Sequence, residues 1–334
     1  MDVKKPMVFA VKHADENVRA KSRSGGFFTA LSDYVLENNG IIYGCVMNDD
    51  LEAIHIRTTD KNGRDLMRGS KYVQSNIGDI YKDVKNELIN GKIVLFTGTS
   101  CQIAGLKCYV KYEYENLLCM DIVCHGVPSP IVFREYITWM EKKYKSKVIK
   151  VNFRNKKNFG WREHIETIEF NNGNTVNSKV FRDLFYKHNI LRPSCYECPY
   201  KSIMHPGDIT IADYWGIEKV VPQFDDNKGV SLVLVNNDKG VKFFEKVKKD
   251  LVWEETDIEH CMQPPLEAPF KRPLDRGAFW KDFHTKKFEY IARKYTQNYG
   301  FSNKIKKKIF FVKCKVSNVV KKLIKRGFYD KGNT

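Results

Sequence analysis

Residues 92–124 constrain the fold of this chain more than any other stretch. A short apolar run at 93–96 is followed by a turn of small residues and a segment of helical character, and a second apolar run occupies 117–123. A strand, a helix and a strand within about 30 residues form a βαβ unit, in which the two strands are parallel. The sequence therefore predicts a mixed α/β fold organised around a parallel sheet.

Two cysteines follow the strands of this unit directly. Cys101 comes after the first strand and Cys124 after the second. Because the carboxyl ends of parallel strands lie at one edge of a sheet, and open α/β proteins bind ligands there, both thiols are expected at a ligand site.

The whole chain divides into three segments, 1–91, 92–260 and 261–334. Residues 1–91 contain a first strand, a helix and a β-hairpin, and from residue 148 onward the pattern indicates short antiparallel strands joined by turns such as 171–174. After residue 260 the sequence is first rich in proline and then basic and helical. The predicted fold class is thus α/β, with a central parallel unit, an antiparallel β-rich region and a helical C-terminal tail.

Charge and cysteine content exclude some classes of function. The net charge is +17, but residues 303–326 alone contain ten Lys or Arg and no acidic residue, and no nucleic-acid-binding signature is present. No apolar run is long enough to span a bilayer, and no signal peptide is recognisable. We therefore expect a cytoplasmic protein that binds no nucleic acid, whose nine cysteines are thiols or metal ligands.

The most specific local motif is Cys195-x-x-Cys198, followed by Pro199. Two thiolates at this spacing can bind one metal or cluster, and the pattern also occurs in dithiol redox sites. Together with Cys101 and Cys124 they make four thiols, which suits a 4Fe-4S cluster or tetrahedral zinc. The alternative for any of these residues is an ordinary free thiol.

Two glycine-containing turns precede predicted helices, at 22–26 and 98–100. Backbone N–H groups at a helix start can bind phosphate, and Lys21 and Arg23 add positive charge beside the first turn. Most such turns bind nothing, and neither is a recognised nucleotide-binding fingerprint.

Two further positions have a functional and a structural interpretation. His125, beside Cys124, is a candidate proton donor or a hydrogen-bonding neighbour of a metal ligand. The strand at 208–214 ends in Asp213, Tyr214 and Trp215, which form either a packed core or one wall of a cofactor pocket.

Taken in order, six motifs of the chain occur at 24–26, 69–75, 96–106, 124–129, 192–199 and 207–213. In this order they resemble the coenzyme F420 hydrogenase/dehydrogenase β-subunit family, over roughly residues 7–260. The chain resembles a short form that lacks the N-terminal ferredoxin module, and is similar to relatives linked to bacterial polysaccharide biosynthesis. Ser100 stands where the family usually has proline.

The resemblance implies an oxidoreductase that contains FAD and a 4Fe-4S cluster and moves electrons between a hydride carrier or small-molecule substrate and a ferredoxin-like or other iron–sulfur partner. Its implied cluster ligands are Cys101, Cys124, Cys195 and Cys198. The candidate catalytic residue is His125, named for its place beside Cys124. The implied flavin-binding residues are Ser24, Gly25, Gly26, Lys71, Gln74, Thr97, Gly98 and Thr99. On this view residues 1–91 are a flavin-binding part, 92–260 an iron–sulfur and flavin part, and 261–334 a linker and basic tail.

Two alternatives belong to other functional classes. Four thiolates also fit a non-catalytic, zinc-binding scaffold. Apolar residues recur at helical spacing among the ten cations of 303–326, which is typical of a helix lying on an anionic membrane surface. That second pattern predicts peripheral contact with the inner membrane, or else packing of the apolar stripe on the body of the protein.

Overall fold

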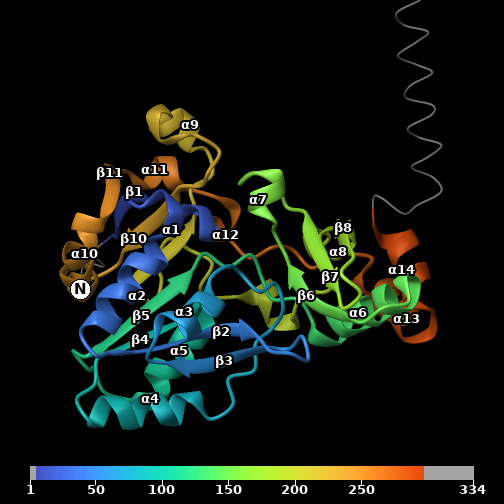
Figure 1. Ribbon diagram of the computed structural model, residues 1–334, viewed down its shortest axis with the longest axis horizontal. Helices are drawn as coiled ribbons and strands as arrows, with labels where there is room; N and C mark the ends of the chain where they lie inside the picture. Colours follow the sequence, from blue (N-terminus) through green and yellow to red (C-terminus); the bar gives the residue numbers. More distant parts are fainter. Residues whose placement is uncertain (1–4, 297–334) are drawn as a thin grey trace, which may run out of the picture.

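The computed structural model describes residues 5–296 and contains, within that range, an eight-stranded mixed sheet and a three-stranded sheet (Figure 1). The large sheet comprises β1 (Met7–His13), β2 (Ile41–Met47), β3 (Ala53–Thr58), β4 (Val94–Thr99), β5 (Leu117–Ile122), β9 (Ile209–Asp213), β10 (Ser231–Val235) and β11 (Leu251–Thr256). Its strand order is β11-β1-β10-β9-β5-β4-β2-β3.

The four strands β2, β4, β5 and β9 are parallel to one another within this sheet. The predicted βαβ unit is confirmed as β4, α5 (Ser100–Val110) and β5. The expectation that everything after residue 148 is antiparallel is wrong for β9, which pairs in parallel with β5. Its partner is chosen by long-range packing, which local sequence does not reveal.

Helices cover both faces of the large sheet, as a buried parallel sheet requires. On one face, α2 (Phe27–Glu37) and α10 (Asp238–Val247) bury an aromatic cluster in which Phe27 and Phe9 both stack on Phe244. On the other, α4 (Ile80–Ile89) and α5 pack on β4 and β5. The short helix α1 (Glu16–Lys21) precedes α2 in the chain, and the short helix α3 (Lys61–Met67) follows β3.

The second sheet is antiparallel, as predicted, in the order β6-β7-β8. Its strands are β6 (Val148–Asn152), β7 (Glu166–Phe170) and β8 (Thr175–Ser178), and its core is shared with α6 (Pro130–Tyr144), α8 (Val180–Tyr186), α13 (Arg276–Thr285) and α14 (Phe288–Tyr295). The remaining short elements are α7 (Lys156–Phe159), η1 (Pro193–Glu197), α9 (Ile217–Val220), η2 (Pro222–Phe224), η3 (Lys248–Asp250), α11 (Ile258–Cys261) and α12 (Pro264–Glu267).

The expected segment boundaries do not coincide with the two sheets. Strand β2 lies before residue 91 and pairs with β4 beyond it, so both segments contribute to one sheet. After residue 261 the chain is more than a linker, because α13 and α14 bury Phe279 and Phe288 in the core of the second sheet. The basic tail at 303–326 lies outside the described residues.

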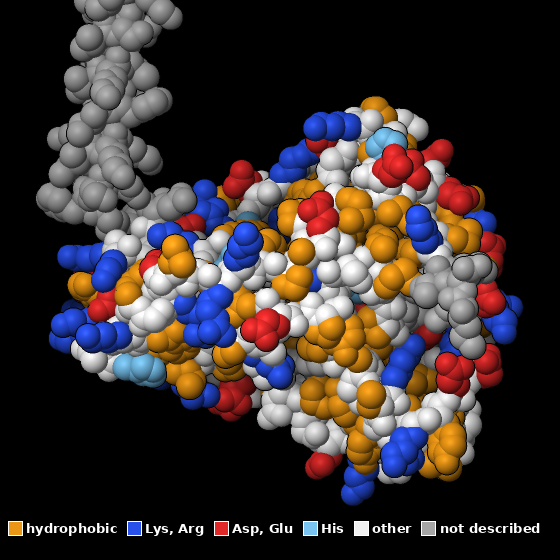
Figure 2. Space-filling view, turned by 180° about the vertical axis from the view of Figure 1, so that it is seen from behind, with side chains coloured by type: hydrophobic (Ala, Val, Ile, Leu, Met, Phe, Trp, Pro, Cys, Tyr) orange, Lys and Arg blue, Asp and Glu red, His pale blue; other side chains and the backbone are white. Residues whose placement is uncertain are grey.

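Among the described residues, the face shown in Figure 2 carries both acidic and basic side chains and no large patch of basic residues alone. Figure 2 shows acidic side chains interspersed among lysines and arginines over one face of the molecule. None of the helices described between residues 5 and 296 is long and apolar enough to cross a membrane.

Gly25 owes its place to tight backbone packing at the start of α2. A Cβ at this residue would lie 2.0 Å from the Val11 carbonyl oxygen and 2.6 Å from the Ser231 nitrogen. Its N–H donates to Ser231 Oγ at 3.0 Å, and its carbonyl accepts from the His13 N–H at 2.8 Å. The N–H of Gly25 is therefore engaged by Ser231 of β10.

Comparing two Gly→Ala variants tests whether the close backbone contacts of Gly25, and not glycine flexibility in general, determine its effect on stability. Gly25→Ala is expected to lower the free energy of unfolding by at least about 1–3 kcal/mol, because the methyl group meets backbone atoms that cannot yield. Gly277→Ala is the control, since a Cβ there has no neighbour within 4 Å and lies in helix α13. It should be neutral or stabilising by up to about 1 kcal/mol. Equal stability of the two variants in urea unfolding would contradict this account.

A buried carboxyl group in the second sheet makes stability depend on pH. Glu166 accepts hydrogen bonds from Tyr136 Oη and from the Arg182 N–H, yet burial raises its pKa to about 8. The folded chain then binds more protons than the unfolded chain between about pH 4.5 and 8, so the free energy of unfolding falls as pH rises through this window.

Glu166→Gln should remove the decrease in the free energy of unfolding that rising pH causes through this carboxyl group. Each pKa unit corresponds to about 1.4 kcal/mol, so the melting temperature of the variant relative to the wild type should rise by several degrees between about pH 5 and about pH 9. Thermal unfolding followed by circular dichroism measures this. A difference that stays constant with pH would exclude Glu166 as the titrating group.

Candidate functional site

A cavity of about 820 Å³ lies at the carboxyl ends of the parallel strands. Residues 97–99 of β4, Met120 and Ile122 of β5, and Asp213 of β9 all line it. This is the edge of the sheet at which the sequence predicted a site, and the volume lies within the range of roughly 300–1,000 Å³ common for ligand pockets.

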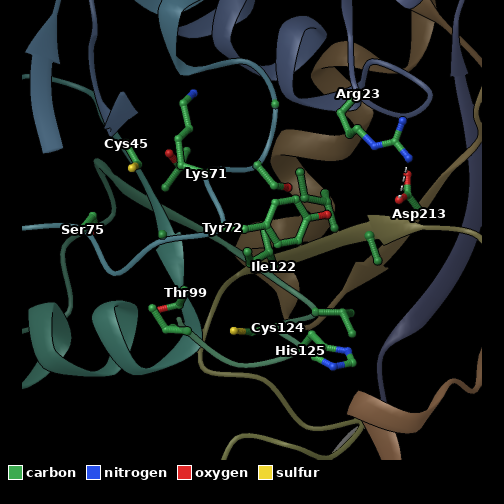
Figure 3. Close-up of a pocket in the computed structure, with 18 of the residues that line it drawn as sticks. Arg23, Cys45, Lys71, Tyr72, Ser75, Thr99, Ile122, Cys124, His125 and Asp213 are labelled. Atoms are coloured by element: carbon green, nitrogen blue, oxygen red, sulfur yellow. Dashed lines mark ion pairs between the residues drawn. The ribbon is translucent and has the colours of Figure 1, made fainter. Parts of the chain in front are cut away.

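The cavity brings together most of the predicted site residues from segments far apart in the chain. Those that line it are Ser24, Gly26, Lys71, Gln74, Thr97, Gly98, Thr99, Cys101, Cys124 and His125. Gly25, Cys195 and Cys198 do not line it. In Figure 3, Thr99, Cys124 and His125 lie at one end, Arg23 and Asp213 at another, and Tyr72 between them.

The β4–α5 turn is fixed by a helix cap. Thr99 is the N-cap of α5, and Gln102 Oε1 accepts a hydrogen bond from its N–H at 2.9 Å. Gln102 Nε2 also donates to Ser75 Oγ at 2.8 Å, which ties the loop at 69–75 to the same turn. Cys101 lies in the first turn of α5 with its Sγ 3.1 Å from Thr99 Oγ1. The start of α5 thus presents an exposed thiol at the cavity wall.

The four predicted cluster cysteines influence one another electrostatically. Burial raises the pKa of Cys124 to about 12, and the neighbouring Cys195 and Cys101 thiols act in the same direction. Burial likewise raises the pKa of Cys195, with further contributions from Cys198 and Cys101, while the Val127 N–H donates to Cys195 Sγ at 3.4 Å. Because Val127 lies three residues after Cys124, its contact with Cys195 places the Cys195-x-x-Cys198 motif beside the segment that follows β5.

The four cysteines do not form a metal-binding group in this structure. Among residues 5–296, no three or more His, Cys, Asp or Glu side chains are grouped closely enough to hold a metal ion. Thiolates are the ligands that iron–sulfur clusters and zinc use, so the donors match such a group in chemistry. Lys201 is a nearby cation. Burial lowers the pKa of Lys201, and the interaction with Cys124 acts in the opposite direction. Binding by all four would require their sulfur atoms to move closer together.

His125 lies in a closed aromatic and cationic environment. Its Nε2 is 2.8 Å from His188 Nε2, and the Phe270 ring lies 4.1 Å from its ring centroid. Burial, with further contributions from His188 and Lys201, lowers its pKa to about 3. His125 is therefore neutral at pH 7, and one ring of the histidine pair donates while the other accepts.

Lys71 is held by backbone carbonyls. Its Nζ donates to the Leu66 oxygen at 2.8 Å and to the Arg68 oxygen at 3.2 Å. Burial lowers its pKa to about 8, so part of the population is neutral in mildly alkaline solution. Cys45 lines the same side of the cavity, and the Lys71 charge partly offsets the burial that raises its pKa.

Sequence reasoning named Arg23 and Asp213 but missed their most important neighbours. Trp161 Nε1 donates to Asp213 Oδ1 at 2.7 Å, and Arg154 NH1 lies 3.0 Å from Asp213 Oδ2. Of the two alternatives for the end of this strand, Asp213 and Trp215 line the cavity, whereas Tyr214 is fully buried in the core. No motif marks Arg154, which follows β6 of the second sheet, so only the packing of the two sheets reveals it.

His55 is a second residue that the sequence did not indicate. It comes from β3, is 6% exposed, and places Nε2 3.0 Å from the Thr97 carbonyl oxygen. Burial lowers its pKa to about 4, and its buried Nδ1 has no hydrogen-bond partner among the described residues.

Comparison with known proteins concerns the fold and the family of the chain. No curated protein matches the chain by sequence. A chain of the F420-reducing NiFe hydrogenase complex from Methanosarcina barkeri, from a xenon derivatization study, has a similar fold, with a TM-score of 0.53 and 18% identity. The alignment covers 90% of this chain and 94% of that chain.

A family match covers just over half of the sequence, and includes the β4–α5–β5 unit and the four cysteines predicted to bind a cluster. Residues 91–260 match the family described as the C terminus of the β subunit in coenzyme F420 hydrogenase/dehydrogenase. The resemblance found in the sequence motifs is thereby confirmed, and the family relation indicates a redox protein. The chain belongs to the coenzyme F420 hydrogenase/dehydrogenase β-subunit family.

Proposed function

We propose that this protein is an oxidoreductase that uses FAD and a 4Fe-4S cluster to move electrons between a hydride carrier or small-molecule substrate and an iron–sulfur partner protein. The observation that carries the proposal is the cavity, which gathers predicted flavin residues from three segments and includes Cys101 and Cys124 in its wall.

The flavin would be held at the carboxyl ends of β4 and β5. Gln74, Thr97 and Thr99 offer amide and hydroxyl groups at the cavity wall, and Gly98 lets a ligand approach the backbone of the turn. A flavin supplies the conversion between hydride transfer and single-electron steps that such an enzyme needs. The neutral His125 at the same wall keeps that end of the cavity free of an extra positive charge.

The cluster would be held by Cys101, Cys124, Cys195 and Cys198. The first two thiols line the cavity, and the second two belong to the η1 segment, Cys195 within it and Cys198 at its C-cap, so this set would join the cavity to η1. Short separation between redox centres favours electron transfer, and the Val127 N–H already donates to one of the sulfur atoms.

The cluster is tested by colour and composition. Protein reconstituted anaerobically with iron and sulfide should be brown and contain both elements, and Cys195→Ser or Cys198→Ser should lose most of this absorbance. Cys261→Ser is the matched control, since Cys261 is 2% exposed in a separate apolar core. Stoichiometric zinc without sulfide would favour the scaffold alternative and overturn the cluster.

The flavin is tested at a residue whose replacement should not disturb the fold. Gln74 is exposed at the cavity wall, so Gln74→Leu should weaken FAD binding by roughly threefold to tenfold through loss of a hydrogen bond. Gln223→Leu, also at an exposed glutamine but outside the cavity, should leave affinity unchanged. Fluorescence titration with FAD measures both, and absence of binding by the wild type would refute the flavin assignment.

A further inference from the structure

The cavity has a cationic end that the predicted cofactor residues do not explain. Arg23 and Arg154 converge there on a single carboxylate, with Arg154 NH1 3.0 Å and Arg23 NH2 3.7 Å from Asp213 Oδ2. Figure 3 shows the Arg23–Asp213 pair at the side of the cavity away from Cys124. Two guanidinium groups and one carboxylate leave an excess positive charge at the cavity wall.

Both arginines keep unused donors in spite of their burial. The Arg154 side chain is 6% exposed and that of Arg23 is 12% exposed. Arg154 Nε and the Nε and NH1 atoms of Arg23 are buried without a hydrogen-bond partner in the part of the chain that the structure describes. An unpaired buried charged donor is costly, and a ligand in the adjoining cavity would relieve that cost once a small shift of either side chain exposes these nearly inaccessible atoms to it.

The two guanidinium groups are held in place from behind. The Trp161 carbonyl oxygen accepts from Arg23 NH2 at 2.7 Å and from Arg154 NH2 at 3.3 Å. The Trp215 ring, itself stacked on Trp161, lies 5.3 Å from the Arg154 guanidinium carbon. Arginines fixed in this way lose little side-chain freedom when they bind a ligand.

Neighbouring groups respond to the same positive potential. Burial, with the charge of Arg23 as the next contributor, lowers the pKa of Lys156 to about 8. Burial likewise lowers the pKa of His164 to about 2, with Arg154 the next contributor. The start of α2 also adds to this potential, because its N-cap Gly26 lines the cavity and the helix dipole is positive there.

We propose that Arg23 and Arg154 form a subsite for an oxyanion, a phosphate or carboxylate group carried by the ligand that occupies the cavity. Guanidinium groups bind such groups through paired hydrogen bonds, and Asp213 is already engaged by Trp161 and Arg154. The inference rests on the proposed function only in that the same cavity holds the redox ligand.

The probe is inorganic pyrophosphate, titrated calorimetrically into the full chain before and after loading with FAD. Wild type without FAD should bind it saturably, and Arg23→Gln should weaken binding by roughly tenfold or more. Arg23→Lys should restore only part of the affinity, because one ammonium group does not reproduce the guanidinium fork. Arg57→Gln is the control, since it removes an arginine paired with Glu87 outside the cavity.

Comparing the titrations of FAD-free and FAD-loaded protein identifies which ligand carries the oxyanion. If FAD supplies it, loading with FAD abolishes pyrophosphate binding, and Arg23→Gln weakens FAD binding as well. If a separate substrate supplies it, FAD-loaded protein still binds pyrophosphate, and Arg23→Gln retains FAD. Either result supports the subsite.

Absence of saturable binding by wild type, or equal affinity of Arg23→Gln and Arg57→Gln, overturns it. Failure of the wild type to bind FAD would reject the proposed function and leave the pyrophosphate titration as an independent test. Circular dichroism of each variant checks that a loss of binding is not a loss of fold.

Discussion

The site depends on the parallel pairing of β5 with β9. Asp208 connects the two strands twice, since its carboxylate accepts from the Cys119 N–H at 2.7 Å and its own N–H donates to the Cys119 carbonyl oxygen at 2.8 Å. On β5, the buried Asp121 accepts from Thr210 Oγ1. Buried, fully paired carboxylates of this kind fix strand register, because a shift of one residue would leave a charge unpaired.

That pairing decides what the cavity contains. It brings Asp213 at the end of β9 to the same edge as Thr99 and Cys124, which lie at the ends of β4 and β5. The second sheet then contributes Arg154 from the segment after β6. One side of the resulting cavity is rich in thiols and small polar groups, and another is cationic. A ligand with a redox-active ring and an anionic substituent would match both sides.

Burial sets the protonation states around the cavity. It lowers the pKa of His125 and His55 and raises that of Cys124, so these groups are neutral at pH 7 in the described structure. Metal binding by Cys124 would therefore require loss of a tightly held proton, as thiolate ligation generally does. The guanidinium groups of Arg23 and Arg154 stay protonated at pH 7, and the proposed oxyanion subsite depends on their positive charge.

Local sequence determined the elements and the family. Helix α2, the β2–β3 hairpin and the β4–α5–β5 unit could be predicted because hydrophobic periodicity and turn residues are local signals. The order of motifs identified the family, and strand ends located the site edge. Only the tertiary structure decided that β9 joins β5, that Gly25 packs against the sheet, and that Arg154 meets Arg23 at Asp213. These outcomes depend on contacts between residues far apart in the chain, which no local pattern of side chains records.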